Sequence, residues 1–431
     1  MQIIFLGGGE GKRMKPLKTD KATIPFLGKL SFYHILKQFK EVGGFDSIVI
    51  VANERNKEEL EGVAKELEVE AKIVIQEKPL GMADSVLTAK EYIKGEVLIS
   101  NTEDFFENSA LEGVLEKAKG GADIVFAGLE VEKYFSGGYL KLEGEKVLGI
   151  VEKPGEGNEP SNVTKLVLDY FKDGEGFVKA LEEASSDKDD VYEVALDKLI
   201  NSGLKAEVSK YKGYWTPIKY SWHLLDVASF LLKSIQKNIS PEAKIASNAV
   251  IEGEVVIEEG VRVFEGAVIK GPAFIGKGTI IGNNALVRES MIEENSAVGS
   301  YTEVARSYIG PHSWFHKNYI GDSVIEGNFE AGSGAITANL RLDGKEIKVG
   351  DQRIDSGKSK LGVIAGEGVR IGANSTTQPG VRIGADSLIG SGVVVSRDVP
   401  EKTKLTVKQE YEISEFGGDD TDYSKFKDNL K

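Results

Sequence analysis

The chain has 431 residues, of which 41% are hydrophobic and 28% charged, a balance typical of a globular protein with two or three domains. Its formal net charge of −14 argues against a general role in binding nucleic acid or membrane surfaces, and the absence of cysteine excludes disulfides and thiolate chemistry. Because no stretch approaches about 18 apolar residues and the short apolar start does not match a signal peptide, we expect a cytoplasmic protein.

Residues 1 to about 225 alternate short apolar strands with amphipathic helical stretches. Strands are expected at 2–6, 47–51, 71–75, 96–99 and 123–126, with helices between them, for example at 32–42 and 57–67. This β-α-β-α order predicts an α/β, Rossmann-like domain with a mainly parallel sheet covered on both faces. In such folds, ligands bind at the C-terminal ends of the strands.

A glycine-rich loop follows the first expected strand and reads Gly7-Gly8-Gly9-Glu10-Gly11-Lys12-Arg13. Glycine lets backbone N–H groups approach a chain of phosphates closely, and the basic residues supply charge. The spacing matches neither the dinucleotide-binding pattern nor the P-loop. On this loop alone, a phosphate site and a turn with solvated lysines are equally supported.

Four further motifs follow the loop in order. They are Lys21 with Pro25, the run Gln76-Glu77-Lys78-Pro79-Leu80-Gly81, Asp104 after the strand at 96–101, and Glu152-Lys153-Pro154. Together with the loop, they make residues 1 to about 230 resemble the sugar-1-phosphate nucleotidylyltransferases. Members of that family join a sugar 1-phosphate to a nucleoside triphosphate and release pyrophosphate.

The resemblance implies a role for each motif. Gly8, Gly9, Gly11 and Arg13 would hold the triphosphate, Lys21 would contact phosphate, and Arg13 and Lys21 would be catalytic. Gln76 and Gly81 would contact the base, Asp104 would bind Mg²⁺, and Gly138, Glu152 and Lys153 would lie near the sugar phosphate. These residue types suit attack of an oxygen on phosphorus, which needs charge neutralisation and positioning more than a protein nucleophile.

Three positions depart from the family pattern. The usual Gly-Asp is Glu103-Asp104, and the sugar-contacting Asn-x-Gly is Lys165-Leu166-Val167. The usual Trp-x-Asp-Ile-Gly, whose Asp is the second metal ligand, is Trp215-Thr216-Pro217-Ile218-Lys219. The missing carboxylate at Pro217 leaves open a head domain with lost or altered activity, and Lys12 and Lys165 are candidates to offset the lost metal charge.

A helical stretch placed at 226–240 connects the first domain, 1–225, to a second, 241–405. In the second domain, aliphatic residues recur every six positions, first at Ile245, Ile251, Ile257, Val263, Ile269, Ile275, Ile281 and Val287, and later at Ile371, Ile383, Ile389 and Val395. This ladder is typical of a parallel β-helix, in which each hexapeptide forms one side of a triangular coil. Residues 406–431 are polar and aperiodic and are expected to be a loosely packed tail.

The ladder lapses between about 290 and 362, where we expect the chemistry of this domain. Two of the four histidines, His312 and His316, fall there, whereas His34 and His223 lie in helical stretches and favour structural roles. The run from His316 reads His-Lys-Asn-Tyr-Ile-Gly-Asp, and a Thr-Ala-Asn motif follows at 337–339.

This block resembles the left-handed β-helix acetyltransferase domain of bifunctional UDP-N-acetylglucosamine-synthesising enzymes, and is most similar to the archaeal type, which acetylates glucosamine or galactosamine 1-phosphate. The resemblance implies His316 as the general base, since a neutral imidazole can accept the proton of an attacking amine. Arg288, Arg306, Tyr319, Asn339, Lys345 and Lys348 would hold the sugar phosphate, and acetyl-CoA would lie along Ser333, Ala373 and Ser391. Ala305 and Glu330 depart from the family pattern and leave the amino sugar open.

Together the two resemblances imply a bifunctional enzyme. Acetyl-CoA would acetylate a hexosamine 1-phosphate, and UTP with Mg²⁺ would then convert the product to a UDP-N-acetylhexosamine. The family also implies a homotrimer formed through the β-helix, with neither nucleic acid nor membrane as a partner. Two alternatives remain: a nucleotidylyltransferase for another sugar 1-phosphate with a structural β-helix, and a protein with a degenerate head, either still an acetyltransferase or a non-catalytic scaffold.

Overall fold

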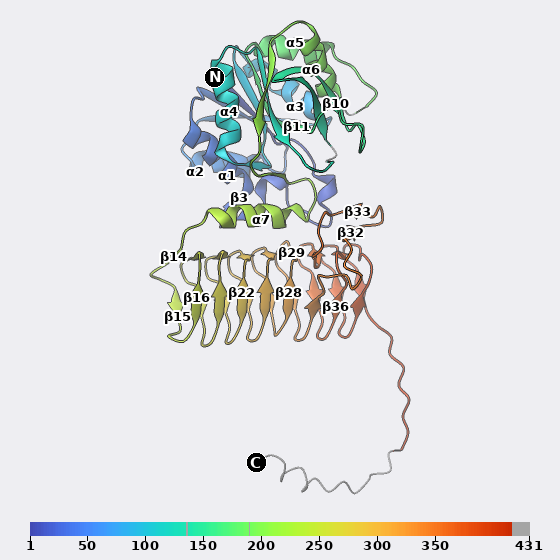
Figure 1. Cartoon of the computed structure of the whole chain (residues 1–431). Coiled ribbons are helices and arrows are strands. Elements are labelled where there is room, and N and C mark those ends of the chain that lie inside the picture. The colour runs from blue at the N-terminus through green and yellow to red at the C-terminus, as the bar shows by residue number, and fades with distance from the viewer. Residues whose placement is uncertain (135–136, 189, 416–431) are drawn as a thin grey trace.

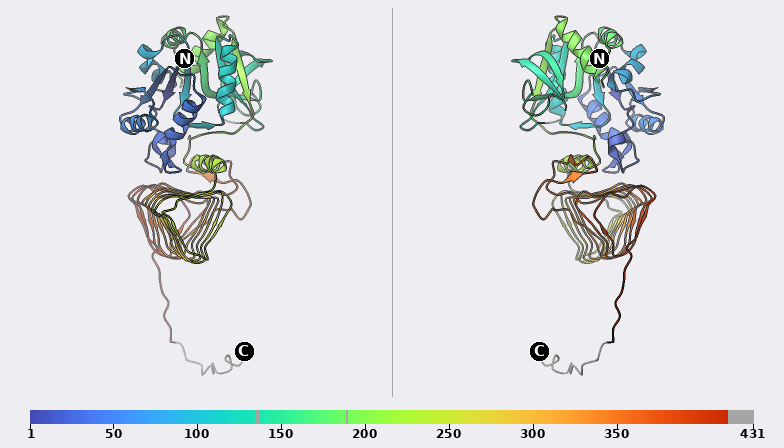
Figure 2. Two further views of the ribbon diagram at one scale, coloured as in Figure 1. Left: turned by 90° about the vertical axis from the view of Figure 1, so that its left-hand side faces the viewer. Right: turned by 90° about the vertical axis from the view of Figure 1, so that its right-hand side faces the viewer.

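The computed structural model describes residues 1–134, 137–188 and 190–415. It has three parts: a head domain, the connecting helix α7 (His223–Ser234), and a triangular column of stacked coils (Figure 1; Figure 2). Residues 406–415 of the predicted tail contain no helix or strand, and the rest of the tail lies outside the described residues. No helix in the described part of the chain is long and apolar enough to cross a membrane.

The head is built on a nine-stranded sheet in the order β5-β4-β1-β6-β11-β8-β12-β10-β9. Its first four strands are parallel as predicted: β5 (Ala71–Ile75), β4 (Ser47–Ala52), β1 (Gln2–Leu6) and β6 (Val97–Asn101). The second half is mixed rather than parallel, because β11 (Val163–Phe171) runs antiparallel to β6 and to β8 (Ile124–Glu130). The remaining strands are β12 (Ala206–Tyr211), β10 (Lys146–Glu152) and β9 (Gly138–Glu143).

Helices cover both faces of this sheet, as the sequence pattern predicts. Ile3 and Phe5 pack with α1 (Ser31–Val42), α2 (Lys57–Glu66) and α4 (Asn108–Lys119). The alternate residues of the same strand, Ile4 and Leu6, pack with α3 (Met82–Thr88), α5 (Gly174–Glu183) and α6 (Val191–Asn201). A strand buried on both faces needs consecutive apolar residues, which explains the run at the start of the chain.

The column is a parallel β-helix with three sheets. The head-facing sheet contains β14 (Asn238–Ile239), β17 (Val255–Ile257), β20 (Ala273–Ile275), β23 (Met291–Ile292), β26 (Tyr308–Ile309), β29 (Val324–Ile325), β34 (Ile364–Ala365) and β37 (Arg382–Ile383). The second sheet contains β15 (Lys244–Ile245), β18 (Arg262–Val263), β21 (Ile280–Ile281), β24 (Ala297–Val298), β27 (Trp314–Phe315), β30 (Glu330–Ala331), β35 (Arg370–Ile371), β38 (Leu388–Ile389) and β40 (Lys404–Leu405). The third contains β16 (Val250–Glu252), β19 (Val268–Lys270), β22 (Leu286–Arg288), β25 (Glu303–Ala305), β28 (Tyr319–Gly321), β31 (Ile336–Thr337), β36 (Thr376–Thr377) and β39 (Val394–Val395).

The stack of coils continues where the six-residue ladder lapses. Strands of the third sheet begin at residues 250, 268, 286, 303, 319 and 336, so the coils shorten from 18 residues to 17, 16 and 17. The shorter coils change the phase of the aliphatic residues without interrupting the pairing. The coils of the column are interrupted at residues 338–362, here called the insertion. The insertion lies in the chain between β31 and β36, which still pair with each other, and it forms the hairpin β32 (Lys348–Val349)–β33 (Ile354–Asp355).

One hydrophobic cluster joins the head to the column. It includes head residues such as Phe26, the buried face of α7, and outward-facing residues of the head-facing sheet: Phe274, Met291, Tyr308, Val324 and Ile364. Helix α7 lies along this sheet (Figure 1). It begins at His223 and ends at Ser234, earlier than the predicted 226–240, because β14 already pairs with β17 from Asn238 on. The head therefore rests on the column through a buried apolar contact.

Candidate active sites

The glycine-rich loop follows β1, an interior strand of the head sheet, and places two predicted nucleotide motifs together. A Cβ atom at Gly8 would lie 2.1 Å from Oε1 of Gln76, so only glycine permits this close approach. Gln76 in turn donates from Nε2 to the carbonyl of Gly81 at 3.3 Å and to Asp84 at 2.7 Å. Gly11 has a φ of 65° and turns the chain into the 3-10 helix that carries Arg13.

Lys21 lies close to the acidic pair Glu103-Asp104, which follows β6. Nζ of Lys21 lies 3.3 Å from Oε1 of Glu103, and Asn101 donates to Asp104 at 3.2 Å. Asp104 is only 3% exposed, and burial together with the charge of Glu103 raises the pKa of its carboxyl group to about 7. A buried carboxyl group with an adjacent like charge favours binding of a cation.

The position of the missing metal ligand lies directly opposite Asp104. Strand β13 (Trp215–Pro217) pairs antiparallel with β7 (Asp104–Phe106), with Pro217 opposite Asp104. Asp104 is therefore the one carboxylate of this pair. Mg²⁺ is commonly held by one or two carboxylates plus substrate phosphates, so Asp104 fits an ion bound mainly through a nucleotide. The described residues contain no cluster of three or more metal-ligating side chains that could hold an ion alone.

Lys219 is a cation of this site that the sequence reasoning missed. It follows β13, and its pKa is lowered first by burial and then by the positive charges of Arg13 and Lys153. Arg13 and Lys153 therefore each lie close enough to Lys219 to act on its charge. Lys153 forms an ion pair with Glu152 at 2.7 Å, and Glu152 is paired across the β9–β10 hairpin with Gly138. Lys219 is thus coupled electrostatically to one predicted sugar-phosphate residue, Lys153, and to one predicted triphosphate residue, Arg13.

The two candidates to replace the missing metal charge, Lys165 and Lys12, lie in different surroundings. Lys165 is buried and forms an ion pair with Asp169 at 2.6 Å, with its ammonium group over the rings of Phe126 and Tyr192. Lys12 is 79% exposed and pairs with Glu10. The interpretation of Lys165 was wrong, because its ammonium group faces a buried carboxylate, whereas the role of the exposed Lys12 stays a prediction.

In the column, His316 lies at the corner between the second and third sheets. This corner repeats along the column, because Phe315 pairs with Ala331, Ala331 with Ile371, and Ile371 with Ile389. The predicted acetyl-CoA residues Ser333, Ala373 and Ser391 all lie at this corner, each two residues after one of those paired positions. Backbone bonds fix the stack, for example from Gly334 to Lys317 at 3.0 Å and from Asn374 to Ser333 at 2.9 Å.

The surroundings of His316 leave its ring accessible. Its backbone N–H donates to Oδ1 of Asn318, and the Asn318 side-chain amide donates to the carbonyls of Gly332 at 2.8 Å and Ala335 at 3.1 Å. Asn318 thereby fixes the backbone on both sides of the corner. The His316 side chain is exposed and has no hydrogen-bond or ion-pair partner within the described residues.

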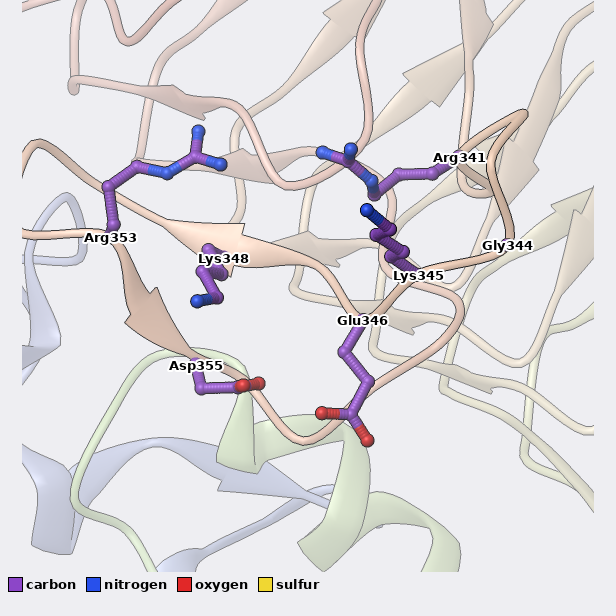
Figure 3. A pocket seen from close by; sticks show the side chains of 7 residues that line it. All are labelled: Arg341, Gly344, Lys345, Glu346, Lys348, Arg353 and Asp355. Atoms are coloured by element: carbon purple, nitrogen blue, oxygen red, sulfur yellow. The ribbon is translucent and has the colours of Figure 1, made fainter.

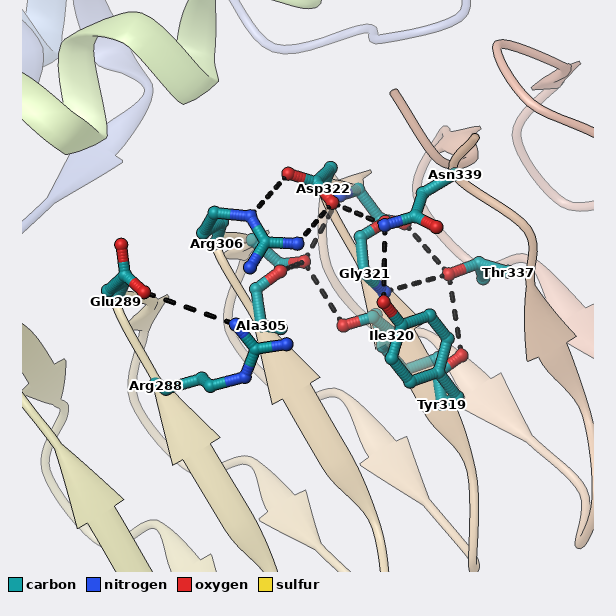
Figure 4. A network of polar contacts seen from close by, with 12 residues as sticks. Arg288, Glu289, Ala305, Arg306, Tyr319, Ile320, Gly321, Asp322, Thr337 and Asn339 are labelled. Carbon is teal, nitrogen blue, oxygen red and sulfur yellow. Dashed lines mark hydrogen bonds and ion pairs between the residues drawn. The ribbon is translucent and has the colours of Figure 1, made fainter. Parts of the chain in front are cut away.

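Two predicted sugar-phosphate residues, Arg306 and Asn339, contact Asp322, and a third, Tyr319, is bonded to Asn339 (Figure 4). Arg306 donates from Nε and Nη2 to the two carboxylate oxygens of Asp322, both at 2.7 Å. Asn339 donates to Asp322 and, at 3.2 Å, to the hydroxyl of Tyr319. Asp322 was part of the quoted motif but received no predicted role. Arg288, one coil away, is instead held by Glu303 at 2.7 Å.

The insertion adds a basic pocket two residues beyond Asn339 (Figure 3). A cavity of about 760 Å³ is lined by Arg341, Gly344, Lys345, Glu346, Lys348, Arg353 and Asp355. It contains the predicted Lys345 and Lys348 together with two arginines that the sequence reasoning missed. Four cations against two carboxylates make this pocket suitable for an anion such as a phosphate.

Sequence comparison assigns the chain to a family. The Nucleotidyl transferase model matches residues 2–234, the GMPPB C-terminal domain model 234–354, and the Bacterial transferase hexapeptide (six repeats) model 363–397. "Bifunctional protein GlmU" of Methanocaldococcus jannaschii is 32% identical over 95% of this chain and 98% of its own. "Bifunctional sugar-1-phosphate nucleotidylyltransferase/acetyltransferase" of Sulfurisphaera tokodaii is 33% identical over 93% and 98%.

The chain belongs to the bifunctional sugar-1-phosphate nucleotidylyltransferase/acetyltransferase family. As a member, it combines a nucleotidylyltransferase head with a left-handed β-helix acetyltransferase domain, which confirms both resemblances. The roles of individual residues stay predictions.

The two histidines predicted to be structural, His34 and His223, make side-chain contacts with backbone carbonyls. Nε2 of His34 lies 2.7 Å from the carbonyl of Phe26, and Nδ1 of His223 lies 2.7 Å from the carbonyl of Pro217. Burial lowers the pKa of both imidazoles. His312 occupies an exposed corner of the column with a φ of 58°.

Proposed function

We propose that this enzyme makes a UDP-N-acetylhexosamine in two steps. The β-helix transfers the acetyl group of acetyl-CoA to the amine of glucosamine 1-phosphate or galactosamine 1-phosphate. The head then couples the product to UTP and releases pyrophosphate. The observation that carries this proposal is the single corner of the column, which holds His316 in one coil and Ser333, Ala373 and Ser391 in the coils that follow.

In the acetyl transfer, His316 accepts a proton from the amine as the nitrogen attacks the thioester carbonyl and coenzyme A leaves. Small residues at the corner leave room for the cofactor and expose backbone N–H groups to the oxyanion. Arg306, oriented by Asp322, and the cations of the insertion bind the sugar phosphate.

In the nucleotidyl transfer, an oxygen of the sugar phosphate attacks the α-phosphorus of UTP, and pyrophosphate leaves. Arg13 and Lys21 neutralise the triphosphate, while Lys153 and Lys219 neutralise the incoming sugar phosphate. Asp104 would hold Mg²⁺, which supplies further charge neutralisation when it is bound. Lys219 supports activity in the absence of a carboxylate at position 217, because it adds positive charge on the same side of the site.

We also propose a homotrimer formed through the second and third sheets. Large apolar side chains are exposed there, including Tyr301 at 65%, Trp314 at 55% and Ile336 at 44%. Trp314 is two residues before His316, so a neighbouring copy packed on it would also cover the catalytic corner. Exclusion of water there would strengthen the electrostatic interactions of the site. Sedimentation or light scattering at several concentrations gives the mass of the assembly and tests this proposal.

Pro217 favours one other candidate function, an acetyltransferase whose head binds nucleotide without turnover. Pyrophosphate release from N-acetylglucosamine 1-phosphate, UTP and Mg²⁺ separates the two candidates. Release at a rate above the enzyme-free control supports the bifunctional proposal. Silence with UTP, with every other NTP and with several sugar phosphates would favour the degenerate head.

The acetyl transfer is tested with glucosamine 1-phosphate, acetyl-CoA and a thiol reagent. His316→Ala should reduce thiol release by about 10²- to 10⁴-fold, the usual contribution of a general base. The matched control is His312→Ala, which removes an exposed histidine from a neighbouring corner and should leave the rate within about two-fold, as surface substitutions do. Equal rates for wild type and His316→Ala would overturn the acetyltransferase assignment of this corner.

A further inference from the structure

Residues 16–28, here called the docking segment, connect the phosphate loop to α1 and carry Lys21. The segment belongs to the head, yet several of its contacts are made with the column. Lys18 forms an ion pair with Asp386 at 3.0 Å, and the hydroxyl of Tyr308 donates to the carbonyl of Pro25 at 2.8 Å. Both partners are β-helix residues more than two hundred positions further along the chain.

Glu326, at the corner after β29, makes the most extensive of these contacts. Its Oε1 accepts hydrogen bonds from the backbone N–H of Lys18 at 2.7 Å, from the backbone N–H of Thr19 at 2.7 Å and from the Thr19 hydroxyl at 2.8 Å. Its Oε2 accepts from the backbone of Glu367, in the next coil, at 2.8 Å. One carboxylate therefore fixes two residues of the head to two coils of the column, with hydrogen bonds strengthened by its charge.

Glu293 provides a second anchor at the far end of the segment. Its Oε2 accepts from the backbone N–H of Gly28 at 3.0 Å. Because the segment is held near both ends, the position of Lys21 between them depends on the column. Lys21 itself is attached to the head through its carbonyl, which accepts from the hydroxyl of Ser31 at 2.6 Å.

A chain of hydrogen bonds leads from Glu326 to the phosphate loop. Thr19 precedes Asp20, whose carboxylate accepts from the side-chain amides of Asn53 and Asn56, both at 3.1 Å. The same two amides donate to the loop carbonyls, Asn56 to Gly7 at 2.9 Å and Asn53 to Gly9 at 3.4 Å. Asp20 also begins the 3-10 helix that contains Lys21 by accepting from Ala22 at 3.0 Å.

We propose that Glu326, a β-helix residue, is a positioning residue for nucleotidyl transfer in the head. By fixing Thr19, it sets Asp20, and Asp20 sets both the phosphate loop and Lys21. The inference rests on the nucleotidyl transfer of the proposed function and extends the role of the β-helix. The column is then a structural part of the nucleotide site as well as an acetyltransferase and an assembly module.

Three variants of the full chain test this inference. Glu326→Ala removes every acceptor, and Glu326→Gln keeps one carbonyl oxygen that can accept from Lys18 and Thr19. Asp386→Asn is the matched control. It weakens a half-exposed contact to the side chain of Lys18 but keeps the hydrogen bond from the Lys18 backbone to Glu326. Each variant is assayed for pyrophosphate release, for thiol release, and for amide hydrogen exchange in peptides covering 12–24.

We expect Glu326→Ala to lower kcat/KM for pyrophosphate release by about 10- to 100-fold, since small displacements of charged groups have effects of this size. Glu326→Gln should recover part of the loss, and Asp386→Asn should stay within about two-fold of wild type. Thiol release should be unchanged in all three, and exchange over 12–24 should increase only in the Glu326 variants. Thiol release reports whether the column itself stays folded.

Two results would overturn the inference: pyrophosphate release that is unchanged in Glu326→Ala, or a parallel fall of both activities with no partial recovery in Glu326→Gln. Absence of pyrophosphate release in the wild type would contradict the proposed function of the head instead. In that case, hydrogen exchange decides the inference: increased exchange over 12–24 in Glu326→Ala supports it, and unchanged exchange refutes it.

Discussion

The two sites of this enzyme are built in different ways. In the column, site residues come from the same corner of successive coils, so His316, Ser333 and Ala373 lie at one corner because the coil repeats. In the head, Gly8, Gln76 and Lys219 come from segments that only the folded sheet brings together. A repeated coil allows neighbours to be read from spacing, whereas an α/β sheet requires the topology first.

Because the two sites lie in different domains, the largest expected effect is the loss of pyrophosphate release without loss of thiol release. Lys21→Ala should reduce pyrophosphate release by about 10²- to 10³-fold, as loss of one charged or donor group at a transition state commonly does. Thiol release should stay at the wild-type rate, because Lys21 lies in the head. The measurement is both assays on one preparation. A loss of thiol release in this variant would show that the sites are not independent in this direction.

A smaller effect is expected from Asp322→Asn, which tests whether stacking alone positions the column site. Arg306 would lose one of two charged acceptors, and the pair is only partly exposed, at 28% for Arg306 and 9% for Asp322. KM for the hexosamine 1-phosphate should rise by about 10-fold, with a loss of about 2 kcal/mol in the free energy of unfolding. Steady-state kinetics and denaturant titration check the two values.

A double-mutant cycle tests whether Asp322 acts on the substrate through Arg306. If Asp322 acts by orienting Arg306, the double variant Asp322→Asn with Arg306→Lys should show no further rise in KM beyond the larger single effect. An additive rise in KM would mean that each residue acts on the substrate separately.

The smallest effect concerns the buried Glu293 at the contact between head and column. Burial, with Glu258 and Glu294 adding, raises its pKa from an ordinary 4.5 to about 8, although the N–H groups of Gly28 and Leu27 oppose this. Between these pH values the unfolded chain loses this proton before the folded chain does. The free energy of unfolding therefore falls as pH rises, and the loss is complete above about pH 8.

Glu293→Gln removes this titration. The Tm of the variant minus the Tm of wild type should be about 2–4 °C larger at pH 9 than at pH 5. Thermal unfolding across this range measures it, with Glu294→Gln, an exposed neighbour, as the control. The buried phenol of Tyr308 also faces Glu293 but stays protonated in this range, because its pKa is raised well above the ordinary value. A Tm difference that does not change with pH would contradict the buried protonated carboxyl group.

The same contrast explains what could be predicted from the sequence. The ladder predicted the column, and the structure shows that the predicted acetyl-CoA residues Ser333, Ala373 and Ser391 share the corner of His316, because the coil repeats. Its lapse was interpreted as a break over 290–362, but coils shorter by one or two residues shift the phase without opening the stack. Only the insertion at 338–362 leaves the column.

In the head, motifs identified the site but not the contacts between distant segments. Lys219 was missed because it is placed by the pairing of β13 with β7, strands separated by about a hundred residues. Lys165 was misassigned because a change of register in β11 between Lys165 and Asp169 brings the two buried side chains together. The sequence did not indicate a role for Glu326, because its partners include backbone N–H groups of another domain, which no residue type marks.

The pair of assays on His316→Ala tests most directly whether acetyl transfer takes place in the column and nucleotidyl transfer in the head. Wild type is expected to release thiol from acetyl-CoA with glucosamine 1-phosphate and pyrophosphate from UTP with N-acetylglucosamine 1-phosphate. We predict that His316→Ala lowers thiol release by about 10²-fold or more and leaves pyrophosphate release unchanged. Retention of thiol release, or loss of both activities in a folded variant, would contradict the assignment of the two reactions to these two regions.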